Sequence, residues 1–264
     1  MWVIKANGEK APFKSEKIYR TCMRAGASPA FAREVVNKVR SKVRSGMSTR
    51  EILRMTLALL KQEPEVAEKY NLKQAIMSLG PSGYAFEKFF ARILEHYGYK
   101  TRVGRIIQGK CVTHEVDISA FNKEKYLVEC KYHNAPGIYT DIKEAMYTYA
   151  RLLDLSNHFD KAWLATNTKL SNHAKKYANC MGMKITSWGY PSGESLQSLI
   201  EKKKLYPVTL LKSVGKYEKE CFASANILLV KDLLTYKAGD LLRKTKIQRS
   251  KLDKIILDAK RLEK

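Results

Sequence analysis

The sequence predicts an α/β protein with three parts: a mixed-sheet core, a small N-terminal domain and an all-helical C-terminal module. Residues 82–203 alternate strand-like and helix-like runs, a pattern typical of a mixed sheet with helices on both faces. Residues 1–81 contain one hairpin signal followed by helical patterns, and residues 204–264 show helical patterns throughout. A chain of 264 residues has room for three small domains.

The N-terminal domain opens with a turn signal. Asn7-Gly8 lies between two short strand-like runs in "WVIKANGEKAPF", which predicts a β-hairpin. Four helical patterns follow, and the third begins with a capping box formed by Ser48 and Glu51. The fourth is expected over residues 64–79, before Gly80-Pro81. This domain is therefore predicted to be a β-hairpin plus four helices.

The middle region carries the order helix, three strands, helix, strand, helix, strand, helix. Its first helix, "GYAFEKFFARILEHYGY", places phenylalanine, isoleucine and leucine on one side. The three strand-like runs are "YKTRVGRII", "CVTHEVDISAF" and "KYLVECKYH". After residue 203 the strand patterns stop, and short helices joined by short turns are expected to the end of the sequence.

The net charge of +23 points to a polyanionic partner. The excess of lysine and arginine is distributed over all three predicted domains and is not confined to a tail. Nucleic acid is the favoured partner, ahead of an anionic membrane surface, and a solvated lysine-rich surface is the plain alternative. No membrane span is expected, because no apolar run approaches the ~20 residues that a span needs, and no membrane is among the predicted partners.

The cysteines predict a reducing compartment. Their number is odd and none forms a CxxC pair, so neither a disulfide framework nor a zinc site is expected. The first residues are strand-like and charged, unlike a signal peptide. A cytoplasmic location is the expectation.

The stretch "HEVDISAFNKEKYLVECKYH" holds the candidate catalytic residues. Glu129 and Lys131 lie two residues apart on one predicted strand, so both side chains leave the same face, while Cys130 points the other way. A tight antiparallel hairpin would bring Asp117 of the preceding strand beside Glu129. Two carboxylates that meet repel each other, and a divalent cation with oxygen ligands removes the conflict.

Lys131 adds the remaining chemistry of such a site. Its ammonium can hold or deprotonate a water, or offset charge that develops on a phosphate. These residue types in this pattern therefore indicate metal-assisted hydrolysis of a phosphodiester. The alternative is an exposed hairpin with an ordinary Glu–Lys surface pair.

These motifs resemble those of a known nuclease superfamily. The helix "GYAFEKFFARILEHYGY", the strand "EVDI", the strand "VECK" and the later "LATNTKLSNHAKKYA" occur in this order. Together, over residues 81–203, they resemble the PD-(D/E)xK nucleases, most closely the Mrr-like restriction endonuclease branch. The core is therefore expected to have a restriction-endonuclease-like fold.

The resemblance implies a DNA endonuclease that uses Mg²⁺ or Mn²⁺. Asp117, Glu129 and the carbonyl of Cys130 would bind the metal, Lys131 would position the attacking water, and Glu87 would be the accessory acid of the first helix. The Mrr-like branch often has a glutamine at the position of Glu129 and a glycine-rich stretch before its aspartate, whereas this chain has a full ExK motif after "CVTHEVDI".

Other polar residues near these motifs have two interpretations each. Glu115 shares a strand face with Asp117, so it is a candidate for a further metal or supporting group. His114 and His133 are expected to be solvated or hydrogen-bonded rather than metal ligands. Asn167 and Ser171 are expected to be capping residues, with phosphate contact as the alternative.

The N-terminal "VIKANGEKAPFKSEKI" resembles the ATP-cone, a nucleotide-sensing domain of ribonucleotide reductases and their repressors. The resemblance implies an ATP or dATP effector, with Lys5 and Lys17 at the triphosphate, Val3 and Phe13 near the base, and Thr49 as a further contact. The chain differs from the family pattern in having Ala6 after its first lysine and Leu53 in the third helix, where arginine and histidine are common. Because no GxxxxGK[ST] motif occurs, a bound nucleotide is expected to regulate.

The C-terminal residues 204–264 resemble tandem helix-hairpin-helix modules. Such hairpins hold DNA phosphates through backbone N–H groups, which favours glycine at both ends of the hairpin. Here the hairpin is "SVG", with Ser213 at the first position and Gly215 at the second, and the second hairpin has no glycine. The net charge of +8 over these residues favours a DNA-binding module, with protein docking as the alternative.

The sequence as a whole predicts a metal-dependent DNA endonuclease that is regulated by ATP or dATP. One alternative is a non-catalytic, nucleotide-sensing DNA-binding regulator that uses the nuclease core only as a scaffold. Another is a structure-specific nuclease that acts on junctions or flaps. Cleavage of both strands needs two active sites, so a homodimer is a further expectation.

Overall fold

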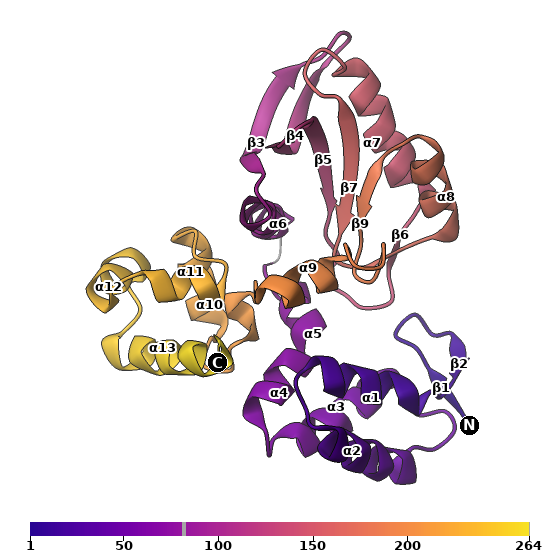
Figure 1. Cartoon of the computed structure of the whole chain (residues 1–264), viewed down its shortest axis with the longest axis vertical. Helices are drawn as coiled ribbons and strands as arrows, with labels where there is room; N and C mark the ends of the chain where they lie inside the picture. The colour runs from indigo at the N-terminus through magenta and orange to yellow at the C-terminus, as the bar shows by residue number, and fades with distance from the viewer. Residues whose placement is uncertain (81–82, 264) are drawn as a thin grey trace.

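The computed structural model describes residues 1–80 and 83–263. Figure 1 shows three lobes: an N-terminal lobe in indigo and purple, a larger lobe that contains the sheet, and a C-terminal lobe in yellow. The predicted boundary between residues 81 and 82, together with Pro81, lies outside the described residues. The predicted fold class is confirmed, because a mixed α/β core lies between a hairpin-plus-helices lobe and an all-helical lobe.

The N-terminal lobe begins with the predicted hairpin. Gly8 takes a positive φ of 82° in its turn, a conformation that glycine adopts without strain. Ser28 and Ser48 cap the second and third helices, and Ser48 forms the predicted capping box with Glu51. The elements are β1 (Trp2–Ile4), β2 (Lys10–Pro12), α1 (Ser15–Arg24), α2 (Pro29–Lys42), α3 (Thr49–Leu60), α4 (Pro64–Tyr70) and α5 (Leu72–Met77).

The predicted helix over residues 64–79 is divided into α4 and α5. Asn71 lies between them with φ −85° and ψ 8°, outside the regular helical range. Asparagine competes with helical backbone bonding through its own side chain, and this makes it a common residue at helix ends. The lobe therefore has five helices, where four were predicted.

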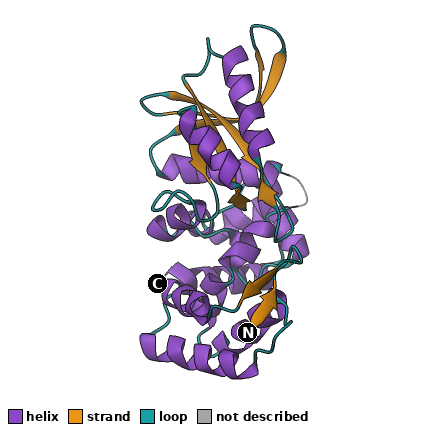
Figure 2. Cartoon of the chain, turned by 90° about the vertical axis from the view of Figure 1, so that its right-hand side faces the viewer, coloured by secondary structure: helices purple, strands orange, loops and turns teal. Residues whose placement is uncertain are grey.

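The middle lobe is built on a five-stranded sheet in the order β3-β4-β5-β7-β9. The β3–β4 and β4–β5 pairs are antiparallel, and the β5–β7 and β7–β9 pairs are parallel. Figure 2 shows these strands together in one half of the molecule, apart from β1 and β2. The strands are β3 (Lys100–Gln108), β4 (Thr113–Phe121), β5 (Lys125–Lys131), β7 (Lys161–Thr166) and β9 (Lys184–Thr186).

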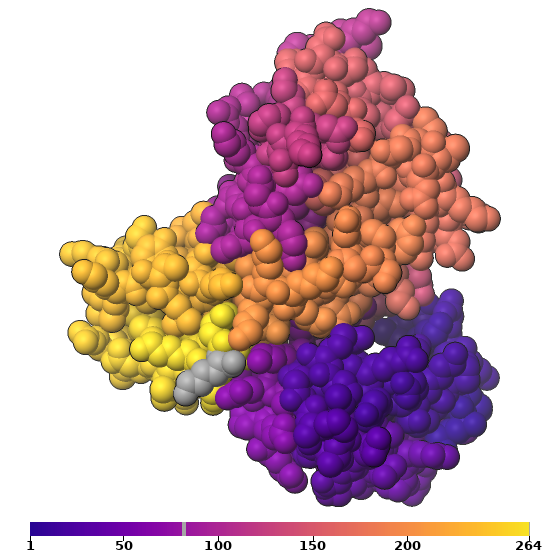
Figure 3. Space-filling view, viewed as in Figure 1, coloured from indigo at the N-terminus to yellow at the C-terminus, as the bar shows by residue number. Residues whose placement is uncertain are grey.

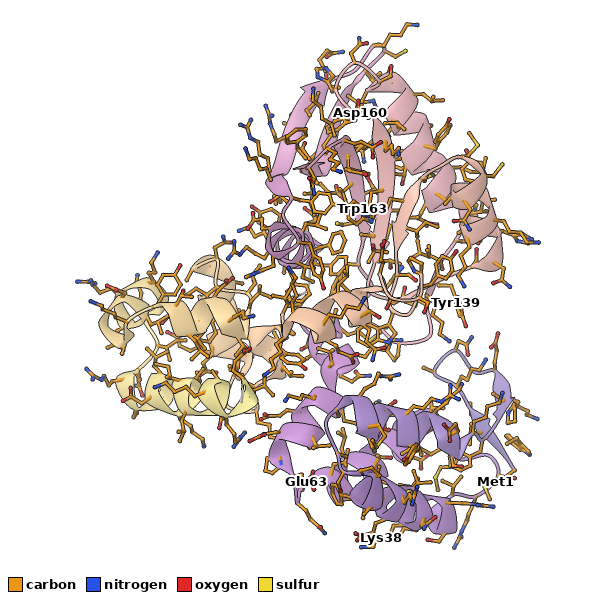
Figure 4. The ribbon with its side chains drawn as sticks, viewed as in Figure 1. Met1, Lys38, Glu63, Tyr139, Asp160 and Trp163 are labelled. Atoms are coloured by element: carbon orange, nitrogen blue, oxygen red, sulfur yellow. The ribbon has the colours of Figure 1, made fainter. Side chains whose placement is uncertain are left out.

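Helices cover both faces of this sheet, as predicted. On one face, α6 (Tyr84–His96) packs Phe90 against Trp163 at the centre of the sheet, a residue labelled in Figure 4. On the other face, α7 (Ile142–Asp154) and α8 (Asn172–Cys180) pack on Ala162 and Leu164. Two short strands, β6 (Tyr139–Thr140) and β8 (Lys169–Leu170), pair in parallel beside the main sheet.

The C-terminal lobe is helical, as predicted, and shares a hydrophobic core with the middle lobe. This core runs from Phe86 and Phe90 of α6 through Leu205 to Leu262 without interruption. Among the described residues, no helix combines the length and the apolar character needed to cross a membrane. The elements are α9 (Leu196–Lys203), η1 (Val208–Leu210), α10 (Lys216–Ser224), α11 (Val230–Thr235), α12 (Ala238–Thr245) and α13 (Arg249–Glu263).

Candidate functional site

The β4–β5 pairing brings the two predicted carboxylates together. Ile118 lies opposite Val128 in the antiparallel register, so Asp117 and Glu129 are the next residues along the two strands. The backbone N–H of Cys130 donates to Asp117 Oδ2 at 2.7 Å, which fixes the aspartate across the gap between the strands. The predicted hairpin therefore delivers Asp117 to the end of β5 that carries the ExK motif.

Glu129 and Lys131 leave the same face of β5 and form an ion pair. Lys131 Nζ lies 2.7 Å from Glu129 Oε1, and Glu129 is only 4% exposed. Burial lowers the pKa of Lys131, but the hydrogen bond to Glu129 and the negative charges of Glu129 and Asp117 together outweigh burial, so the net pKa is raised. The ammonium therefore stays charged at neutral pH, which favours charge stabilisation over general-base action for this lysine.

Arg151 is a residue of this site that the sequence reasoning missed. It lies on α7, is 5% exposed, and its guanidinium donates to Glu129 Oε2 and to the carbonyl of Glu115. The signal was present in the sequence: Ala145, Thr148 and Arg151 follow one another at intervals of three, and all three are buried. An arginine on the buried face of a helix needs a polar partner inside the protein.

Glu87 enters the same electrostatic environment from the first turn of α6. Burial is the largest cause that raises its pKa to about 7, and the negative charges of Asp117, Glu115 and Glu129 contribute to the same rise. Burial likewise raises the pKa of Asp117 to about 6, with Glu129 as the next cause. The neighbouring carboxylates thus contribute to each other's raised pKa values. Such a cluster creates negative potential, which would attract a cation.

The donor set fits a hard divalent cation, because it consists of carboxylate oxygens and the Cys130 carbonyl. The Cys130 thiol is no candidate ligand, since burial raises its pKa well above the ordinary value and keeps it protonated. Both oxygens of Glu129 already accept bonds, one from Lys131 and one from Arg151. Within the described residues, no group of three or more His, Cys, Asp or Glu side chains is arranged around a common point for a metal.

The neighbouring polar residues are held by other groups. His114 Nε2 lies 2.7 Å from Asp154 Oδ2, and His133 Nε2 lies 3.1 Å from Thr140 Oγ1. The buried Asn167 donates its amide to the carbonyl of His133 at 2.7 Å, so it ties two strand ends together.

Two further candidates have simple positions. Ser171 accepts from the N–H of Ala174 and caps α8, in line with the capping expectation. The side chain of Glu115 is exposed, although its carbonyl binds Arg151.

The predicted nucleotide residues gather around the hairpin of the N-terminal lobe. Val3 is buried in the lobe's core, and Phe13 packs against this core. Lys5 forms an ion pair with Glu9 at 2.9 Å, and its charge acts on Lys17 of α1.

Thr49 completes this set at the start of α3. It is the first residue of that helix, and a bridge between Ile4 and Ser48 ties β1 to the helix start. The hairpin and the N-terminus of α3 therefore lie side by side, which places Thr49 near the strand that leads into Lys5.

The "SVG" hairpin of the C-terminal lobe has its glycine amide occupied. The N–H of Gly215 donates to Glu218 Oε2 at 2.7 Å. A phosphate would have to displace this carboxylate to use the same amide, and the two would repel each other. The Gly215 amide is therefore already used in capping α10.

Three family models match successive parts of the chain. The ATP cone domain matches residues 1–74, the restriction endonuclease model Mrr_cat matches residues 80–199, and the model described as AF1548-like, C-terminal, matches residues 206–263. These matches follow the predicted order of a nucleotide-sensing, a nuclease and a C-terminal part.

Two related proteins match much of the chain. An uncharacterized protein of Archaeoglobus fulgidus is 43% identical over 175 residues, which are 65% of this chain and 98% of that protein. A crystal structure of a protein of unknown function, AF1548, superposes with a TM-score of 0.62 at 40% identity, covering 69% of this chain and 98% of the other. The chain therefore belongs to the family of the Archaeoglobus fulgidus protein, and it joins an ATP cone domain, an Mrr_cat restriction endonuclease domain and an AF1548-like C-terminal domain.

Proposed function

We propose that the protein is a metal-dependent DNA endonuclease whose activity responds to ATP or dATP. The observation that carries the proposal is the meeting of Asp117, Glu129 and Lys131 at one end of β5, inside a restriction endonuclease domain. A scaffold that served binding alone would have no reason to keep two mutually repelling carboxylates half-buried or buried beside a lysine.

Each residue has a defined task in this reaction. Asp117, Glu129 and the Cys130 carbonyl would hold Mg²⁺ or Mn²⁺, which when bound supplies positive charge to the phosphate and to the attacking water. Lys131 would orient that water and stabilise the negative charge that develops on the phosphate oxygens. Arg151 would keep Glu129 in position when the Lys131 ammonium leaves the Glu129 carboxylate and moves to a phosphate oxygen of the substrate. Glu87, with a pKa of about 7, can accept a proton near neutral pH.

The remaining parts supply affinity and control. The net charge of +23 provides sequence-independent attraction to the DNA backbone. Lys5, Lys17 and Thr49 would bind the nucleotide, with Val3 and Phe13 beneath the base. Cleavage of both DNA strands would require a second copy of the chain, because one chain offers one such site.

A cleavage assay tests the proposal. Supercoiled, linear, single-stranded and branched DNA are incubated with Mg²⁺ or Mn²⁺, with and without ATP. We expect cleavage that needs the metal and is lost in Lys131→Ala and Asp117→Ala, while both variants keep their DNA affinity because phosphate contacts elsewhere supply it. The ranking of substrates separates a restriction-like enzyme from a junction-specific one.

Lys161→Ala is the matched control for Lys131→Ala. Lys161 begins β7 and pairs with Glu124 at 2.7 Å, but it lies at the opposite end of the strands and is exposed. Its removal should leave cleavage unchanged. Full cleavage by Lys131→Ala would reject the site, and salt-sensitive DNA binding without any cleavage would favour the non-catalytic regulator.

A further inference from the structure

The hairpin of the ATP cone domain touches the nuclease domain directly. Gly137, in the loop between β5 and β6, approaches the turn so closely that an added Cβ would lie 2.8 Å from the N atom of Asn7. Gly137 also has a positive φ of 93°, so the loop requires glycine for two reasons. In Figure 1 the β1–β2 hairpin reaches toward the β6 end of the sheet, and in Figure 4 Tyr139 faces it.

Lys169 lies at this junction, on the nuclease side. It pairs with Tyr139 in the parallel register of β6 and β8, and its Nζ lies 6.0 Å from the centre of the Tyr139 ring. Lys169 is exposed. Tyr139 lies two residues after Gly137, so the pairing of β6 with β8 brings the charge of Lys169 close to the hairpin of the cone.

The charges on the cone side respond to Lys169. Burial is the largest cause that lowers the pKa of Lys17. The positive charge of Lys169 lowers it further, by more than the charges of Lys14 and Lys5 do. Burial also lowers the pKa of Lys73, at the start of α5, with Lys169 again as the second cause. Lysines of the two domains therefore act electrostatically on one another across the junction.

A gathering of like charges is costly unless an anion binds there. Glu9 neutralises Lys5 in part, at 2.9 Å. A nucleoside triphosphate brings several negative charges in a row, which would balance lysines on both sides of the junction. Figure 3 shows the indigo N-terminal lobe lying next to the orange surface of the nuclease domain.

We propose that Lys169 of the nuclease domain binds the polyphosphate of the nucleotide held by Lys5 and Lys17, so that the effector bridges the two domains. This inference rests on the proposed nucleotide binding by the cone and adds a residue from outside it. The bridge calls for a nucleoside triphosphate rather than a monophosphate, because three phosphates extend farther from the ribose than one.

A route from Lys169 to the candidate active site is built into the fold. Thr140, next to Tyr139 on β6, donates to Thr166 at 2.9 Å, and Thr166 lies opposite Lys131 in the β5–β7 register. Thr140 also lies 3.1 Å from the ring of His133, two residues after Lys131. A nucleotide that holds Lys169 therefore also restrains the strand ends that carry the ExK motif.

Calorimetric titration of the full chain with ATP and with AMP tests the inference. We expect Lys169→Ala to weaken ATP binding by about tenfold, the loss of one charged contact, and to leave the much weaker AMP binding unchanged. Lys175→Ala is the matched control, because Lys175 also lies over a tyrosine ring of the nuclease domain, 4.9 Å from the centre of Tyr190. This control should bind ATP like the wild type.

The outcomes separate this inference from the proposed nucleotide binding. If wild type and Lys5→Ala both fail to bind ATP, nucleotide binding itself is rejected and the inference with it. If Lys5→Ala loses ATP while Lys169→Ala binds as tightly as Lys175→Ala, the cone binds nucleotide alone and only the bridge is rejected. An equal loss of ATP and AMP in Lys169→Ala would also overturn the bridge, since AMP cannot reach it.

Discussion

At the residue scale, Glu129 is held by two cations with different tasks. Arg151 is as buried as Glu129 and binds it from α7, whereas the side chain of Lys131 is 34% exposed and can turn toward a substrate. Taking a carboxylate and a guanidinium out of water is costly, and their pairing offsets that cost only while both are present. Arg151 is therefore a positioning residue for the carboxylate that would bind metal.

Replacing Arg151 by methionine should destabilise the protein by about 3–5 kcal/mol. The reason is that Oε2 of the buried Glu129 carboxylate loses its cationic partner. Urea denaturation measures this loss. The double variant Glu129→Gln/Arg151→Met serves as control and should regain a substantial part of the lost stability, since the uncompensated charge is gone. Equal stability of the single and double variants would show that Arg151 acts through packing alone.

Asp154 links the β3–β4 turn to α7, and its titration should appear in the acid stability of the protein. Its hydrogen bond with His114, followed by the bonds from Cys111, holds the pKa of Asp154 well below its usual range. A depressed pKa contributes stability above the unfolded value of about 4, and this contribution is lost as the pH falls further.

The expected result is that the melting temperature of wild type falls more steeply than that of Asp154→Asn between pH 5 and pH 3. Asp160→Asn is the comparison variant, because Asp160 holds the amide of Lys125 without a histidine partner. Parallel pH profiles for wild type and Asp154→Asn would contradict this account.

At the element scale, α3 depends on its N-terminal cap for both stability and position. The Ser48 hydroxyl accepts from the N–H of Glu51, the Glu51 carboxylate accepts from the N–H of Ser48, and Ser48 is bridged to Ile4 of β1. The cap therefore fixes the helix that carries Thr49 against the hairpin that carries Lys5.

Ser48→Ala should reduce stability by about 1 kcal/mol and increase hydrogen exchange at the first-turn amides of α3, because it removes the side-chain acceptor of the cap. Ser28→Ala is the matched control, since Ser28 caps α2 by a single bond to the N–H of Phe31. Its effect on exchange should be confined to α2. Unchanged exchange in α3 of Ser48→Ala would mean that tertiary packing alone holds the helix start.

At the scale of the whole molecule, the three lobes are joined by ion pairs between distant parts of the chain. Arg92 of α6 binds Asp232 of α11 at 2.7 Å, and Arg261 of α13 lies 3.2 Å from Glu68 of α4. Glu68 is only 2% exposed. Burial raises its pKa, and the positive charge of Arg261 lowers it by a smaller amount. The C-terminal lobe is therefore linked by ion pairs to both the N-terminal lobe and the middle lobe.

Arg261→Ala should lower the stability of the whole protein by about 1–3 kcal/mol, because it leaves the buried carboxylate of Glu68 without its cation. Arg243→Ala removes an arginine of the same module that pairs with Asp240 but is 81% exposed, and this exposed pair should contribute at most about 1 kcal/mol. Thermal unfolding of both variants beside the wild type compares them. Equal shifts would show that the Glu68 contact is no stronger than a surface pair.

The sequence by itself determined the features that depend on local pattern. The alternation of side chains along a strand placed Glu129 and Lys131 on one face, and the short connection between two strand patterns brought Asp117 to them. The Asn7-Gly8 turn and the Ser48 cap followed from the conformations and bonds that these residues favour. Such features need only neighbours in the chain, so they can be predicted without the fold.

Only the tertiary structure decided the contacts between distant segments. Arg151 meets Glu129 across 22 positions of sequence, and Lys169 faces the cone because β8 pairs with β6. A buried ion pair or a junction between domains is selected by the free energy of the whole arrangement, and no local periodicity records which partner that will be.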